Sequence, residues 1–131
     1  MRNKFLLAAL VWTVFVTYLC LTDATNIPKV SWLHIQNKDK IVHFTFYFVF
    51  TFLWVNALKQ YDKFTPKKAR IYIFIVAFIF GIIIEICQGI LGKGRSADVI
   101  DVLANTSGSA LSILVLWLLE RRKEKINVPS R

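Results

Sequence analysis

The sequence is short of cysteine, of acidic residues and of recognisable enzyme motifs. Only two cysteines and eight Asp and Glu residues occur in 131 positions, against 17 Lys and Arg. We predict that Cys20 and Cys87 are buried thiols; a disulfide between them is the alternative. The chain has no internal repeat, no low-complexity tract, and no nucleophile elbow, phosphate loop or dinucleotide fingerprint. No motif therefore indicates a familiar enzyme class.

Apolar residues, in contrast, make up 56% of the chain, above the roughly 45–50% of soluble domains. Four segments have the length that an α-helix needs to cross a hydrocarbon core of about 30 Å. They are residues 5–21, 41–58, 71–91 and 99–119. Seven aromatic side chains in the second segment are expected to contact lipid: Phe44, Phe46, Tyr47, Phe48, Phe50, Phe52 and Trp54. The sequence predicts a single all-α domain, a four-helix transmembrane bundle.

The basic residues predict how this bundle is oriented. Twelve of the 17 Lys and Arg lie before residue 5, in the loop 59–70 or in the charged tail 120–131. The other five lie in the loops 22–40 and 92–98. The positive-inside rule therefore places both termini in the cytoplasm and these two loops outside a cytoplasmic (inner) membrane. The net charge of +9 reflects this bias and attraction to membrane lipids, and no separate basic patch suggests nucleic acid.

The first span also has features of a secretory signal, because small residues follow it at 22–24. Its length and the three later spans favour a retained anchor over a cleaved signal.

Glu85 lies within the apolar segment 71–91, where a carboxylate costs several kcal/mol and marks a functional candidate. Helical spacing places polar and small residues on one face of three segments. These are Asp39, His43 and Tyr47; then Gly81, Glu85, Gln88 and Gly92; then Asp98, Asp101, Asn105, Gly108 and Ser112. At 1.5 Å per residue, they form layers roughly 3–5 Å and about 9 Å below the outer surface. We expect them to line a polar cavity open to the outside.

Several of these residues also have a structural interpretation, and for Glu85 it is helix packing as a protonated or paired side chain inside the bundle. Asp98 and Asp101 suit the first turn of a helix, Asp39 suits an N-cap, and Asn105 suits contact between helices. The loop 92–97 offers glycines, the Arg95 guanidinium and the start of the last helix to an anion, or it is a tight turn.

Together these residues resemble the VanZ-like family of bacterial integral membrane proteins. The pattern is Asp39-Lys40-x-x-His43 with Tyr47, Glu85-x-x-Gln88, and Arg95-x-x-Asp98 with Asp101, Asn105 and Gly108. It covers about two-thirds of the chain, and Ser112 stands where a further Gly is frequent. The family takes its name from a protein associated with resistance to the glycopeptide antibiotic teicoplanin. The resemblance implies a role in a bacterial cell envelope and transfers no reaction.

Three functions stay open, and the favoured one is a cavity that binds an anionic lipid-linked or cell-wall-related group. The second is an enzyme with His43 and Glu85 as an acid–base pair on a lipid-linked substrate. The third is a small proton-coupled transporter, disfavoured because the inner halves of the spans are nearly pure Leu, Ile, Val and Phe. The expected ligand-binding residues are Asp39, Lys40, Tyr47, Gln88, Arg95, Asp98, Asp101 and Asn105. His43, Glu85, Asp98 and Asp101 could also hold a divalent metal, but one histidine with scattered carboxylates is weak support, so we predict no metal and no cofactor.

Overall fold

The computed structural model describes residues 2–22, 38–92 and 97–126, which form four α-helices and no strand. They are α1 (Arg2–Leu21), α2 (Lys38–Leu58), α3 (Pro66–Leu91) and α4 (Val99–Ile126). All four are long and apolar enough to cross a membrane. The predicted all-α architecture with four transmembrane helices is therefore confirmed.

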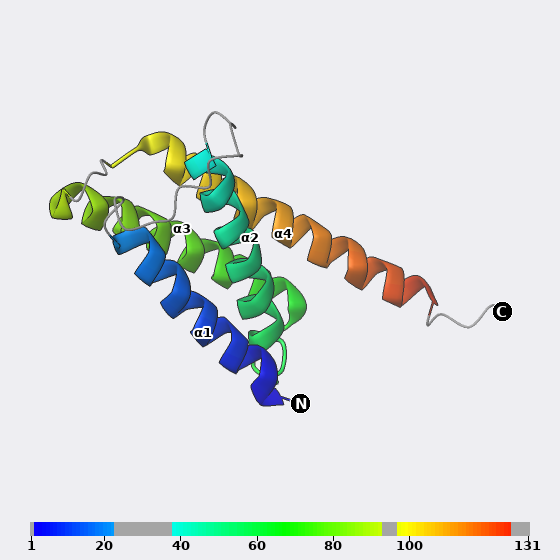
Figure 1. Cartoon of the computed structure of the whole chain (residues 1–131). Coiled ribbons are helices and arrows are strands. Elements are labelled where there is room, and N and C mark those ends of the chain that lie inside the picture. The colour runs from blue at the N-terminus through cyan, green and yellow to red at the C-terminus, as the bar shows by residue number, and fades with distance from the viewer. Residues whose placement is uncertain (1, 23–37, 93–96, 127–131) are drawn as a thin grey trace.

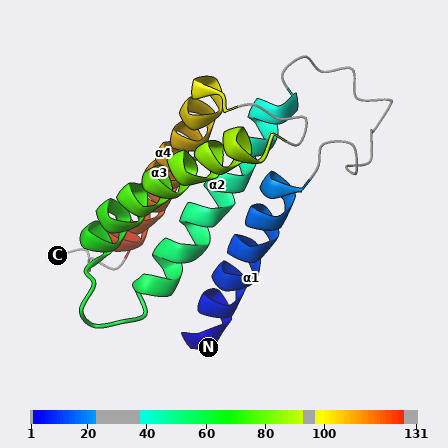
Figure 2. The ribbon, with the colours of Figure 1, turned by 90° about the vertical axis from the view of Figure 1, so that its left-hand side faces the viewer.

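Successive helices run in opposite directions, so the ends of the bundle differ (Figures 1 and 2). We call the end where α2 and α4 begin the site end. The opposite end carries residues 59–65, the start of α1 and the end of α4, and we call it the loop end. Both ends of the described chain thus lie on one side of the bundle. Which side of a membrane this is stays a prediction from the basic residues.

The helix ends match the physical rules for capping. The Thr65 hydroxyl accepts a hydrogen bond from the Lys68 N–H, and Pro66 occupies the first turn, where its missing N–H costs nothing. Gly92 ends α3 in the left-handed region, with φ 58°, and its N–H bonds to the Gln88 carbonyl. The last helix continues to Ile126, seven residues beyond the span predicted to end at 119. Charged residues with high helix propensity extend it past the apolar segment.

Helices α2 and α3 each contact the other three helices, whereas α1 and α4 do not pack against each other within the described residues. The contacts of α2 are the more extensive, so α2 is the centre of the bundle. Its closest neighbour is α4, and Gly108 makes this approach possible. A Cβ at position 108 would collide with the Phe44 carbonyl group of α2. The small residue therefore fixes how near α2 and α4 lie.

The central place of α2 corrects one expectation in part, since two of its seven aromatic side chains are buried away from lipid. Tyr47 and Phe50 are buried and the other five are half-buried. Phe50 stacks on Phe80 of α3, and Trp54 donates a hydrogen bond to Thr13 of α1. The apolar outer surface comes instead from aliphatic side chains such as Ile90 and Leu103. Cys20 is buried and Cys87 half-buried, and no disulfide joins them.

Candidate functional site

Lys40 lies at the mouth of the site end, where its ammonium group joins three aspartates. Its Nζ donates hydrogen bonds to Asp39 and Asp98 at 2.9 Å and to Asp101 at 3.0 Å. The hydrogen bond from Lys40 lowers the pKa of the Asp98 carboxyl. The N–H of Ile100 also donates a hydrogen bond to Asp98 Oδ1 and lowers the same pKa. Lys40 therefore ties the start of α2 to the start of α4 and is engaged by carboxylates.

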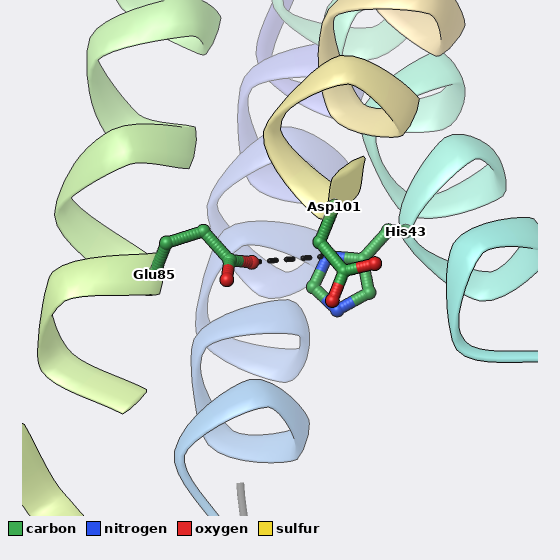
Figure 3. Close-up of side chains that lie close together, drawn as sticks. All are labelled: His43, Glu85 and Asp101. Carbon is green, nitrogen blue, oxygen red and sulfur yellow. Dashed lines mark ion pairs between the residues drawn. The ribbon is translucent and has the colours of Figure 1, made fainter. Parts of the chain in front are cut away.

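Below Lys40, three helices bring a histidine and two carboxylates together (Figure 3). His43 comes from α2, Glu85 from α3 and Asp101 from α4, and all three side chains are buried. His43 Nδ1 lies 3.7 Å from Glu85 Oε1 and 3.1 Å from Asn105 Oδ1. Glu85 Oε2 accepts a hydrogen bond from the N–H of Asp98 at 3.1 Å. The start of α4 thus fixes one oxygen of Glu85 and leaves the other facing His43.

Several buried polar atoms around this contact make no hydrogen bond within the described part of the chain. They are Glu85 Oε1, Tyr47 Oη and Asn105 Nδ2, with Ser112 Oγ deeper in the bundle. A Cβ at Gly81 would lie 3.3 Å from Asn105 Nδ2 and 3.5 Å from the Tyr47 ring, so these two side chains adjoin each other. Unpaired donors and acceptors of this kind are rare in protein interiors and costly, at about 1–3 kcal/mol each.

Two expected ligand-binding residues, Gln88 and Asp39, stand apart from this centre. The Gln88 amide donates a hydrogen bond of 2.8 Å to the Cys20 carbonyl and so connects α3 to the C-terminal end of α1. Arg95 lies outside the described residues, and its predicted place beside His43 and Glu85 stays a prediction. Asp39 is at the rim, with a side chain 57% exposed. Its position inside the first turn of α2 differs from the N-cap that the structural interpretation expected.

Two further polar residues of the stripe were missed. The hydroxyl of Thr51 donates to Ser109 at 3.0 Å, and both side chains are fully enclosed. Thr51 follows Tyr47 by four residues, and Ser109 follows Asn105 by four, so the same spacing would have found them. The interior next to the site is therefore more polar than we predicted, since the inner halves were expected to be nearly pure Leu, Ile, Val and Phe.

An apolar cluster separates this stripe from the loop end. Val55, Ala69, Ile73 and Leu116 form it, with exposed fractions of 0–3%. A cavity of about 430 Å³ lies between α3 and α4 near the loop end, and none of the site residues lines it. The polar site and this cavity are therefore separate features.

The fold and this site define the class: a multi-pass membrane protein with ionisable side chains buried at one end of its bundle. The chain belongs to the VanZ/LLP1 family, whose model matches residues 5–120, and this confirms the VanZ-like resemblance. It is also similar to an uncharacterised protein of the fission yeast Schizosaccharomyces pombe. The two are 28% identical over 130 residues, covering 97% of this chain and 72% of the relative. No solved structure matches the chain at a significant level.

Proposed function

We propose that this protein binds the anionic head group of a lipid-linked molecule at the site end of the bundle. The observation that carries the proposal is the set of three buried, unpaired polar atoms around the contact between His43 and Glu85. Inside a membrane, such atoms are satisfied by facing one another, water or a ligand. A polar head group with several oxygens offers partners to the Tyr47 hydroxyl, the Asn105 amide and the His43 ring.

The position of the site favours a ligand that is itself part of the membrane. His43 lies five residues inside α2, which is roughly 7–8 Å from the start of the helix. The start of α4 beside it exposes Val99, Ile100 and Leu103 to the outside of the bundle. A molecule with a polar head and a hydrocarbon tail could place its head beside His43 and its tail along this apolar surface.

Phosphate is the anionic group that we propose. The VanZ-like resemblance suggests a bacterial cell envelope, a cell-wall-related ligand and a link to glycopeptide resistance, and we retain these as parts of the proposal. Because a similar protein occurs in yeast, which has no peptidoglycan, we favour a group that is not specific to peptidoglycan. A ligand shared by the two proteins would be a lipid phosphate. Arg95, in the loop before α4, is the cation that we expect to reach it.

The arrangement also favours a second candidate, an enzyme acting on the same lipid-linked group. A histidine 3.7 Å from a carboxylate oxygen has the proximity that an acid–base pair needs. The proton-coupled transporter is less supported, because the apolar cluster around Val55 and Leu116 offers no polar route to the loop end. Thr51 and Ser109 lengthen the polar stripe without crossing that cluster.

The test compares retention of a polyprenyl phosphate with that of the matching polyprenol by the protein purified in detergent, using native mass spectrometry. These ligands differ only in the phosphate, so we expect selective retention of the phosphorylated one. Glu85→Leu removes the polar contacts of this side chain and should abolish this selectivity. Ile86→Leu, a lipid-facing change on the next residue, is the control.

Equal retention of the alcohol and the phosphate would refute the binding proposal. If the wild type cleaves the lipid and Glu85→Gln binds it without cleaving it, the enzyme is the correct alternative.

A further inference from the structure

The charges of the described residues leave the site short of positive charge. Lys40 already contacts three aspartates, at 2.9–3.0 Å. Glu85 is the fourth carboxylate of the site end, is 3% exposed and contacts no Lys or Arg within the described residues. A site with this balance repels a phosphate unless another cation is present. The site therefore needs a further cation if it is to hold a phosphate.

The geometry around Glu85 suits a metal ion. His43, Glu85 and Asp101 each offer one ligand atom, and these atoms lie within 4.8 Å of one another. Ligand atoms that lie about 2.0–2.2 Å from a zinc ion are roughly 3–4 Å from one another. Modest side-chain rotations would bring the three atoms to these distances. Figure 3 shows the three side chains facing one another from three helices. Their exposed fractions of 4%, 3% and 7% mean that little water competes for them.

An independent observation is Glu85 Oε1, which is buried, makes no hydrogen bond within the described residues and points at the histidine ring. The surrounding groups hold the donor atoms in place. The Asp98 N–H bonds to the other Glu85 oxygen, Lys40 bonds to Asp101, and Asn105 accepts a hydrogen bond of 3.1 Å from His43 Nδ1, which leaves Nε2 as the nitrogen for the ion. Metal-binding histidines are commonly oriented through a second hydrogen bond of this kind.

We propose that His43, Glu85 and Asp101 bind one divalent transition-metal ion, of the zinc or manganese class. One imidazole and two carboxylates are ligands that these ions accept, and three protein ligands leave coordination positions open. An open coordination position would take a phosphate oxygen. This inference rests on the proposed function only for the identity of that added ligand.

The alternative occupant is a proton, which would make His43 and Glu85 a simple ion pair. Metal analysis separates the two. The full-length protein is purified in detergent without added lipid, stripped with chelator and reloaded with Zn²⁺, Mn²⁺ or Co²⁺. We expect one ion per chain by elemental analysis, with Co²⁺ giving the visible absorption of a low-symmetry site. Asp101→Asn and His43→Gln should each weaken binding at least tenfold.

Asp62→Asn is the control, because it removes one exposed carboxylate at the loop end. Circular dichroism identifies variants that fail to fold, and the isosteric Glu85→Gln supplies a third test if they do. Less than a tenth of an ion per chain, or equal binding by Glu85→Gln and wild type, would overturn the metal site. Metal binding without preference for the phosphorylated lipid would leave this inference standing and refute the proposed function.

A different observation, the cavity near the loop end, carries a second inference. Its walls are Ile71, Phe74, Ile75, Ala110 and Ile113, and its rim carries Lys67 and Arg70. A volume of about 430 Å³ is in the range of ligand pockets.

The positive charge around the rim exceeds the negative charge. Arg70 and Lys59 share one partner, the carboxylate of Glu120. Burial lowers the pKa of Lys59, and the nearby charges of Arg70 and Lys123 lower it further. Lys67 is exposed and forms no ion pair within the described residues. An additional anion at this rim would relieve the repulsion among the cations.

We infer that this cavity binds an acyl chain of an anionic phospholipid, whose phosphate contacts Lys67 and Arg70. In nanodiscs with equal phosphatidylglycerol and phosphatidylcholine, Lys67→Gln and the cavity-filling Ile113→Trp should reduce the phosphatidylglycerol retained after extraction by half or more. Lys68→Gln, which removes the same charge outside the cavity, should leave it unchanged. Equal losses in the two lysine variants, or full retention by Ile113→Trp, would overturn the inference.

Discussion

Replacing Gly108 with alanine should separate the two helices that carry most of the candidate site. The new Cβ would lie 2.9 Å from the Phe44 carbonyl carbon and 3.1 Å from its Cα, and closer still to the oxygen. Ordinary contacts of a Cβ are 3.4–4 Å, so α2 and α4 must move apart by roughly 1 Å. The bond of 3.1 Å between His43 and Asn105 would then lengthen to about 4 Å and be lost.

The magnitude follows from three contributions. Overpacking costs about 1–3 kcal/mol, and the lost hydrogen bond adds about 1 kcal/mol. The higher helix propensity of alanine acts in the opposite direction by about 1 kcal/mol. We therefore expect Gly108→Ala to lower the free energy of unfolding by about 1–3 kcal/mol, even though alanine is the better helix former.

The assay is reversible unfolding in mixed micelles by increasing dodecyl sulfate, followed by circular dichroism. Ser107→Ala is the matched control, because it lies exposed on the same helix and should change stability by less than about 0.5 kcal/mol. A second measurement is metal content, which should fall in Gly108→Ala and not in the control. Wild-type stability of Gly108→Ala would refute the close contact between α2 and α4.

Three further predictions concern topology, charge and capping. A cysteine probe at Gln36 should react with an impermeant reagent from outside and one at Lys63 should not, and the reverse pattern would overturn the orientation. Burial lowers the pKa of Lys59 in the folded protein. At pH values just below the ordinary lysine pKa of about 10.4, the unfolded chain therefore binds more protons than the folded protein, and the free energy of unfolding should rise with pH. Lys59→Met should remove that rise in a pH series of thermal unfolding, and a persisting slope would contradict it. Thr65→Ala removes the N-cap of α3 and should cost about 1 kcal/mol in the same assay, whereas Thr65→Ser should cost little; equal losses would argue against the cap.

The fold was predictable because lipid imposes few solutions. Apolar segments of spanning length must become helices to satisfy their own backbone groups, so the four elements follow from the sequence. Which helix occupies the centre does not follow from hydropathy. Aromatic residues suit both lipid contact and a packed interior, and the aromatic-rich α2 proved to be central. The contact of Gly108 with Phe44 decides this, and a small residue alone does not reveal its partner.

The side-chain centre was partly predictable from helical spacing. Residues three and four positions apart share a face, so His43 and Asp101 were expected in one layer and Glu85 and Asn105 in the layer below it. The structure brings all four side chains together. Spacing gives no information on pairing across helices. The hydrogen bond from Gln88 to a carbonyl of α1 was therefore not predictable from helical spacing.

The charge of the site end connects the two proposals that concern it. Lys40 is held by three carboxylates, so it is poorly placed to attract an anion by itself. A phosphate therefore needs either Arg95 or a metal ion as its principal partner, and these make different predictions. Arg95→Lys keeps a positive charge and loses the planar fork, so it should weaken phosphate binding with metal content unchanged. Asp101→Asn should remove the metal and, with it, the preference for phosphate. If Asp101→Asn instead strengthens phosphate binding, simple charge repulsion governs the site and no metal is needed.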